Sequence, residues 1–304
     1  MADINRTTNS MALPSELSNE ILQKTQQESA IMRLAKHIPL PGRGATIPVI
    51  TNDPSAAWVA ETGVKPVSNA TPATKLMTAY KLAVIETFSK EFVRDIPALY
   101  NALVARLPLA LAGVFDSTVI GATQAPGQNF DTFASCTGQS ILNANNGTYL
   151  GLAAADADIA NGGGVMNGLA MGAQGRGLLL TATDTTGRPL FMASANDGVV
   201  DKVLGVPVYF NKNVYKAGTA AVGTTAGTPA VVGVAGDWTK ALFGTVAGVE
   251  IAFTDTASLT VGSGTSATTI NLWQQNMVAV RAEIEVGFRA DTACFNLLKG
   301  AIPT

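Results

Sequence analysis

The stretch from Lys75 to Ala122 constrains the fold more than any other part of the sequence. Residues Lys75 to Phe88 predict a long strand that leads into a helix, for which Asp95 is a suitable N-cap. Within that helix Pro108 is expected to kink or split the chain. The helix itself is indicated by apolar residues at helical spacing: Leu99, Leu103, Leu107, Leu111 and Val114. A long strand that feeds a long helix indicates a scaffold on which the other segments are arranged.

The composition is apolar and poor in charge. Of 304 residues, 47% are hydrophobic and 14% are charged. This length is compatible with two domains or with one domain that carries large insertions. The low charge is unusual for a freely soluble enzyme, because exposed surface is normally well charged. It is typical of a subunit that buries much of its surface against neighbours, and the net charge of −2 gives no basic bias toward tight phosphate binding.

Targeting and redox signals are weak in this sequence. The segment Met1–Arg6 is polar and predicts no secretory signal, and no run of about twenty apolar residues predicts a membrane span. Cys136 and Cys294 have neither metal-ligand nor redox spacing. We therefore expect two small, mostly buried cysteines without a disulfide, in a reducing compartment.

Catalytic residue patterns are also lacking. The one histidine, His37, is expected at the end of an N-terminal helix in a surface or packing role. Asp156 and Asp158 are two residues apart on an expected helix and so do not face each other. Two glycine groups fit turns and tight packing better than a phosphate loop: Gly162–Gly164, and Gly172, Gly175 and Gly177. No metal site and no cofactor are predicted.

The first third of the chain contains a long excursion. A helix capped by Ser15 is expected to run to about Lys36 and to lie on a surface, because its middle has few apolar residues. Residues Arg43 to about Leu82 then predict two strands without a core of their own. Because an isolated two-stranded ribbon is barely stable in water, this one is expected to dock on its own domain or on a neighbouring subunit.

From Tyr149 to Thr265 the composition shifts to glycine and small residues, which indicates a second domain inserted into the first. Its expected elements are a helix over 151–160, strands over 176–183, 203–210 and 240–254, and an exposed low-complexity loop or hairpin over 216–235. Residues 271–300 then return to the scaffold. Apolar and mostly charged residues alternate from Val278 to Arg289, the clearest strand of the sequence.

A series of short stretches from Leu13 to the end occurs in a familiar order: Ala57–Glu61 with Lys65–Pro66, Phe88–Asp95, the helix ending near Gly121, Asp184–Leu190, Leu204–Val208, Gly236–Trp238, Gln275–Glu283 and Ala293–Phe295. In this order they resemble the major capsid proteins of tailed bacteriophages, which share the Hong Kong 97-type fold. The resemblance implies an α+β fold with five parts: an N-terminal arm (1–42), an extended β-hairpin loop (43–82), a peripheral domain with a long spine helix (83–148), an inserted axial domain (149–265) and a C-terminal return to the peripheral domain (266–304).

The resemblance also implies a function. Such a chain would be a structural shell subunit and not an enzyme, forming hexamers and pentamers of an icosahedral capsid around double-stranded DNA. Contact with the packaged DNA would be weak and non-specific, and assembly would take place in the cytoplasm of a bacterial host. Scaffolding, portal and decoration proteins are candidate partners, with no membrane. The N-terminus is short for the scaffolding region of some members, so a separate scaffolding protein, or none, is implied if Met1 is the true start.

Some members of this family join their subunits by isopeptide bonds between an extended-loop lysine and an asparagine, beside a glutamate. The matching positions in this sequence are Lys65, Asn276 and Glu283. The lysine must lose its proton to attack the amide carbon, and a carboxylate in an apolar setting can accept that proton. The wider set of expected inter-subunit contacts is Trp58, Glu61, Lys65, Arg94, Arg281 and Glu283.

Two other interpretations remain open from the sequence. An encapsulin-type compartment shares the fold but encloses protein cargo instead of DNA. A soluble α+β enzyme is the third interpretation, and the scarcity of catalytic residues weighs against it. The enclosed contents would separate the first two, and a monomeric particle in solution would favour the third.

Overall fold

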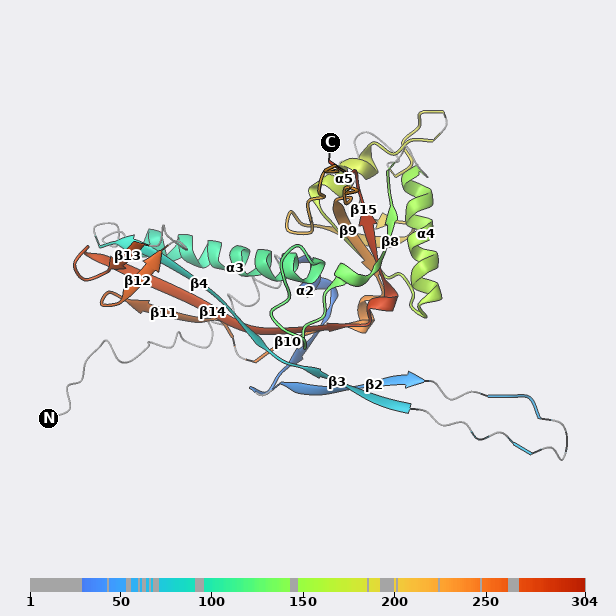
Figure 1. Ribbon diagram of the computed structural model, residues 1–304, viewed down its shortest axis with the longest axis horizontal. Helices are drawn as coiled ribbons and strands as arrows, with labels where there is room; N and C mark the ends of the chain where they lie inside the picture. Colours follow the sequence, from blue (N-terminus) through green and yellow to red (C-terminus); the bar gives the residue numbers. More distant parts are fainter. Residues whose placement is uncertain are drawn as a thin grey trace.

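The computed structural model describes residues 29–303 apart from 43, 53–55, 60, 62–63, 66, 68–70, 91–95, 143–146, 185, 192–199, 201, 224, 247 and 262–267. The molecule is elongated (Figure 1). One sheet with a long helix along it forms one half, a second sheet with two helices forms the other, and a two-stranded ribbon projects from the junction.

The first sheet is built around β14 (Met277–Ala290), which confirms the strand predicted from the alternating pattern. One edge of β14 pairs with β4 (Tyr80–Ser89), and the other pairs with β11 (Glu250–Thr254) and then β10 (Ala241–Thr245), all antiparallel. A parallel strand, β1 (Lys36–Pro39), completes the sheet beside β10. A separate hairpin, β12 (Ser258–Val261) with β13 (Thr268–Asn271), lies at the far end.

The long helix α3 (Ile96–Ile120) lies along this sheet and is continuous (Figure 1). The expectation that Pro108 splits it was wrong. A proline inside a helix costs about 3 kcal/mol, and burial of the C-terminal half of α3, at Leu111, Phe115 and Val119, offsets this cost. The helix ends at Gly121 with φ +82°, the left-handed conformation that closes many helices. Asp95, the expected N-cap, lies outside the described residues.

The second sheet has six strands in the order β5 (Thr137–Ser140), β15 (Phe295–Lys299), β9 (Val231–Gly236), β6 (Gly168–Met171), β8 (Val206–Phe210) and β7 (Lys202–Val203). Helix α4 (Gly147–Asn161) packs beside it and confirms the helix predicted over 151–160. Residues 176–183, expected as a strand, instead lie mostly in helix α5 (Ala173–Leu180). A short apolar run such as Leu178–Leu180 fits either structure, and here the helix buries Leu179.

The low-complexity segment over 216–235 has two parts. The residues up to 229 form mostly exposed irregular bridges, as expected for a surface loop. Residues 231–236, however, are the fully buried strand β9 at the centre of the second sheet, so the loop prediction was wrong there. Small residues such as Gly233 and Ala235 fit this position because neighbouring strands and side chains approach closely.

The ribbon comprises β2 (Ala45–Asn52) and β3 (Thr71–Met77), paired antiparallel, together with the described residues of the segment that joins them. Residues 78 and 79 separate β3 from β4, so the single strand predicted from Lys75 is two strands that belong to different sheets. The two strands project away from the rest of the molecule (Figure 1).

The N-terminal helix prediction was wrong at its C-terminal end. Helix α2 (Ala30–Leu34) stops two residues before Lys36, and Lys36 and His37 lie in strand β1. Its residues Ala30, Ile31 and Met32 are buried, so this part of the chain belongs to the core and not to a surface. Residues 15–28 of the expected helix lie outside the described part of the chain.

Short 3₁₀ turns connect the two sheets: η2 (Phe133–Ser135), η3 (Trp238–Lys240) and η5 (Thr292–Cys294). An aromatic cluster fills the junction, with the Phe288 ring centroid 5.6 Å from that of Phe133 and 6.0 Å from that of Phe115. The sheets do not follow the boundary drawn at residue 265, because β10 and β11 pair with β14. The division into arm, loop, peripheral and axial domains stays a prediction.

Candidate functional site

The ribbon carries the most exposed large apolar side chains of the described chain. Trp58 has a relative exposure of 105%, Val64 of 95% and Val67 of 90%. Glu61 and Lys65, both expected contact residues, are exposed beside them. Several exposed apolar groups on one projecting segment make it a candidate interaction surface.

The base of the ribbon is fixed to the first sheet. The Arg289 guanidinium donates two hydrogen bonds to the Leu76 carbonyl, at 2.6 and 2.9 Å, and a third to Asp131 Oδ1 at 2.7 Å. Met77 beside it is fully buried. The ribbon is therefore held at one end and open to contacts at the other. Sequence reasoning assigned Arg289 only to the charged face of a strand, since its partners are more than 150 residues away.

A second group of expected contact residues lies on β14. Glu283 is 9% exposed and forms ion pairs with Lys81 of β4, at 3.4 Å, and with Arg281, at 3.5 Å. Lys81 also approaches Glu285 at 3.7 Å. Because Lys81 is partly exposed, these ion pairs contribute only about 1 kcal/mol or less to the stability of the subunit. Arg94, the remaining expected contact, lies outside the described residues.

Asn276 lies directly before β14 and is exposed, with φ +53°. Asparagine tolerates this left-handed conformation better than other non-glycine residues. Glu283 lies six positions after Met277 along β14, which corresponds to about 20 Å. The segment that joins β2 to β3, and that includes Lys65, lies at the opposite side of the molecule from the start of β14 (Figure 1). One subunit thus does not bring the three cross-link candidates together, and a bond would require several copies.

A buried carboxyl group joins α3 to the start of α2. Asp116 is fully buried and accepts hydrogen bonds from Ser29 Oγ, at 2.5 Å, and from the Ala30 backbone N–H, at 3.2 Å. Burial raises its pKa to about 7, although these hydrogen bonds favour the charged form. Sequence reasoning missed this contact, because Ser29 and Asp116 are 87 residues apart.

Both cysteines are free, and Cys294 is buried whereas Cys136 is partly buried. Burial raises the pKa of the Cys136 thiol to about 12, with a contribution from Asp291. The pKa of Cys294 is also raised by burial, although Lys240 Nζ lies 3.3 Å from its sulfur. Thiols with raised pKa are poor nucleophiles, so both groups suit packing at the junction of the sheets.

The other catalytic candidates are accounted for by packing. His37 Nε2 lies 2.8 Å from Thr245 Oγ1, and the centres of the His37 and Phe243 rings are 4.9 Å apart. Burial lowers the pKa of His37. Asp158 accepts hydrogen bonds from Gln139 and Asn296. A Cβ on Gly162 would meet a backbone oxygen at 2.1 Å, which explains a glycine there without a phosphate ligand.

Within the described part of the chain, no group of histidine, cysteine or acidic side chains could hold a metal ion. None of the helices described there is long and apolar enough to cross a membrane.

The family model described as the phage capsid family matches residues 9–293. The chain belongs to the phage capsid family. A probable major capsid protein of Mycobacterium phage L5 is 28% identical over 295 residues, which cover 92% of this chain and 86% of that protein. The major capsid protein of Staphylococcus phage 80alpha is 26% identical, with 93% and 83% covered.

Solved structures share the fold of this chain. A chain from Gordonia phage Cozz has a TM-score of 0.68 at 21% identity, covering 91% of this chain and 87% of that one. A chain from Microbacterium phage Oxtober96 also has a TM-score of 0.68, at 19% identity, with 99% and 95% covered. The capsid protein therefore has the Hong Kong 97-type α+β fold that the sequence predicted. It is a phage major capsid protein, a component of the virion shell, and these matches give no support to an encapsulin.

Proposed function

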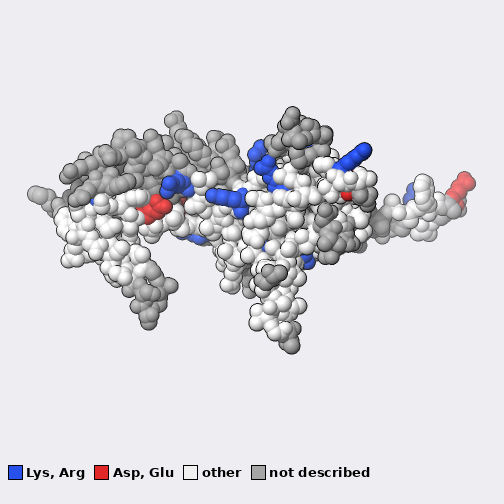
Figure 2. All heavy atoms as spheres, turned by 90° about the horizontal axis from the view of Figure 1, so that it is seen from above, with Lys and Arg blue, Asp and Glu red and all other residues white. Residues whose placement is uncertain are grey.

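We propose that this capsid protein assembles into hexamers and pentamers of an icosahedral shell that encloses double-stranded DNA, in the cytoplasm of a bacterial host. The ribbon carries this proposal, because Trp58, Val64 and Val67 are exposed on a segment with almost no core of its own. Docking of the ribbon on an adjacent subunit would cover these side chains. The low charge of the chain fits a subunit with several neighbours, and most of the described surface on the face in Figure 2 carries neither basic nor acidic residues.

The proposed role is structural and not catalytic. It rests on membership of a structural family and on the packing roles of His37 and the two cysteines.

Deletion of Pro54 to Pro72 tests the role of the ribbon. The truncated chain is expected to stay soluble and folded, because the two sheets do not depend on the removed residues. It should form no closed shells by electron microscopy, whereas the full chain should. Normal shells from the truncated chain would contradict the proposal.

We also propose that Lys65 is positioned to reach Asn276 of another copy, with Glu283 of a further copy as the proton acceptor. The support is the exposure of Lys65 and Asn276. Glu283 is nearly buried but paired with Lys81 and Arg281, so it can accept the proton only once an incoming lysine replaces these partners. The lysine nitrogen would attack the side-chain amide carbon, forming an isopeptide bond and releasing ammonia. Particles boiled in denaturant should give a ladder of covalent multimers on a gel, and Lys65→Ala, Asn276→Ala and Glu283→Ala should each abolish it. A single band near 31.3 kDa from unmodified particles would refute cross-linking.

A further inference from the structure

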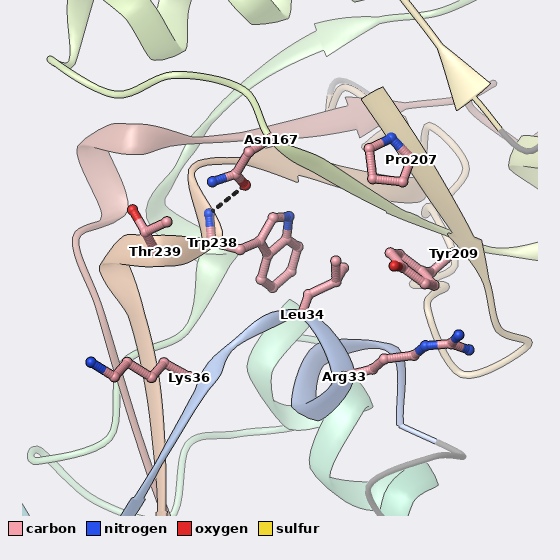
Figure 3. Close-up of a pocket in the computed structure, with 8 residues that line it drawn as sticks. All are labelled: Arg33, Leu34, Lys36, Asn167, Pro207, Tyr209, Trp238 and Thr239. Atoms are coloured by element: carbon pink, nitrogen blue, oxygen red, sulfur yellow. Dashed lines mark hydrogen bonds between the residues drawn. The ribbon is translucent and has the colours of Figure 1, made fainter. Parts of the chain in front are cut away.

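An open hollow lies where α2 and β1 meet the second sheet, with a volume of about 530 Å³. Figure 3 shows Arg33 and Leu34 of α2, Lys36 of β1, Tyr209 of β8, and Trp238 around it. A second hollow, of about 520 Å³, shares Arg33, Pro207 and Tyr209 with the first and adds Lys202 of β7. The two therefore form one groove, called here the basic groove and defined by Lys36, Arg33, Lys202 and Tyr209.

Three cations follow one another along this groove. Arg33 lines both hollows, while Lys36 lines only the first and Lys202 only the second, so Arg33 is the central charge. Figure 3 shows the Arg33 and Lys36 side chains extending toward opposite ends of the first hollow. All three cations are exposed, and none has an ion pair with an acidic group among the described residues.

The remaining lining favours an anion. The Arg33 guanidinium lies 4.6 Å from the centre of the Tyr209 ring, which holds the long side chain across the groove. Asp237, which precedes the lining residue Trp238, accepts hydrogen bonds from Asn167 Nδ2 and from Thr239 Oγ1 and N–H. Among the described contacts, this carboxylate forms no ion pair with any of the three cations.

We propose that the basic groove contacts the phosphate backbone of the packaged double-stranded DNA. This proposal rests on the proposed function, in which the shell encloses DNA. A row of exposed cations suits a linear polyanion with regularly spaced charges, whereas one acidic side chain of a neighbour would engage one cation. Exposed cations bind phosphate weakly and in a salt-dependent way, as a shell that takes up and releases DNA requires. The net charge of −2 then limits such contact to this local surface.

The test compares two triple variants of the full chain. Arg33→Gln, Lys36→Gln and Lys202→Gln together neutralise the groove. The control, Arg106→Gln, Arg188→Gln and Lys212→Gln, removes the same charge from three exposed positions that do not line it. Binding of soluble subunits to a 20-base-pair duplex (length about two helical turns) is measured by fluorescence anisotropy across a sodium chloride series. Shell assembly of each chain is scored by electron microscopy.

Each phosphate contact contributes about 0.9 to the slope of log affinity against log salt. The groove variant should therefore lose a slope of about 2 to 3 and bind about tenfold more weakly at low salt. The control should stay close to the unmodified chain, and both variants should still form shells. An unchanged slope in the groove variant, or an equal loss in both variants, would overturn the proposal.

Loss of assembly in the groove variant with DNA binding unchanged would also overturn it, and would instead assign the groove to an acidic surface of a neighbouring subunit. The assembly measurement keeps the two proposals apart. If the unmodified chain forms no shells, the proposed function fails, whereas the salt slope of soluble subunits still reports on the groove.

Discussion

The two-sheet body and the ribbon are both built from extended strands, but they differ in what covers those strands. In the body, Phe288 is fully buried among the rings of Phe115, Phe130 and Phe133. Among the described side chains of the ribbon strands, Met77 at the base is the one that is buried. Most large aromatic groups at the junction of the body are thus buried within one subunit, while Trp58, Val64 and Val67 of the ribbon are exposed.

This difference separates two properties in one chain. Substitutions of buried body residues are expected to change the stability of the subunit, because their packing is formed within one subunit. Substitutions near the ribbon tip are expected to change assembly and to leave the isolated subunit as stable as before. Each prediction below tests that separation, beginning with the largest expected effect.

Phe288→Ala should lower the free energy of unfolding of the subunit by about 3–5 kcal/mol, because a large side chain is removed from a filled site. Trp58→Ala removes a side chain of similar size that contacts solvent, and should change that free energy by less than about 0.5 kcal/mol. Urea unfolding of soluble subunits measures both. Trp58→Ala subunits should still fold, but electron microscopy should show that they form closed shells poorly.

The comparison breaks down if Trp58→Ala destabilises the soluble subunit as much as Phe288→Ala does. That result would mean that the ribbon folds back on its own subunit in solution.

The next prediction concerns the polar contact that joins α2 to the body. The pKa of Asp116, about 7, lies above its ordinary value of 3.8 because of burial. The stability that its protonation contributes is therefore complete below about pH 4 and is lost as the pH rises through about 7. Subunits should lose on the order of a few kcal/mol between these limits. The urea midpoint of the unmodified chain should therefore fall as the pH is raised from about 4 to about 7.

Asp116→Asn is the matched variant, because an amide keeps one acceptor for Ala30 and does not titrate. Its midpoints should fall less over the same range, while Trp58→Ala should keep the full dependence. Equal pH dependence in the unmodified chain and in Asp116→Asn would show that other groups cause it.

Local patterns in the sequence predicted the elements whose surroundings are simple. The alternation from Val278 to Arg289 indicated β14 because a strand buried mainly through one face shows its environment in every second residue. The ribbon was predicted because its two strands had no apolar core of their own in the sequence. Helix α5 was misread because eight residues with three consecutive leucines carry too little periodicity to distinguish a helix from a buried strand.

Contacts between distant segments could not be read in this way. The pairing of β1 with β10 and the hydrogen bond from Ser29 to Asp116 depend on how the completed sheets meet. The basic groove is of the same kind, since Arg33, Lys36 and Lys202 come together only through α2, β1 and the β7–β8 hairpin. The order of the family-like stretches nevertheless indicated the fold, because members of one family share the same long-range contacts.

A smaller effect is expected at the base of the ribbon. Gly44 has φ +86°, and a Cβ there would lie 2.4 Å from the Met77 carbonyl oxygen. Gly44→Ala should therefore weaken the attachment of the ribbon by about 2 kcal/mol. Hydrogen exchange should become faster for amides of β2 and β3 and should stay unchanged in β14. Gly42→Ala is the control, because no atom lies within 4 Å of the position that its Cβ would take, and it should leave all of these rates unchanged.

The smallest effect is expected at a turn within the body. Leu204 and Gly205 join β7 to β8 with φ values of 52° and 80°, as in a type I′ turn, for which Asn-Gly is the preferred pair. Leucine is strained in this conformation, and its side chain is partly exposed, so Leu204→Asn removes strain at little cost in burial. It should raise the free energy of unfolding by about 1 kcal/mol. Gly205→Ala has space for its Cβ but adds strain, and should lower that free energy by a similar amount. If both substitutions shift the urea midpoint in the same direction, the backbone conformation of this turn is not what limits the stability of the body at this edge.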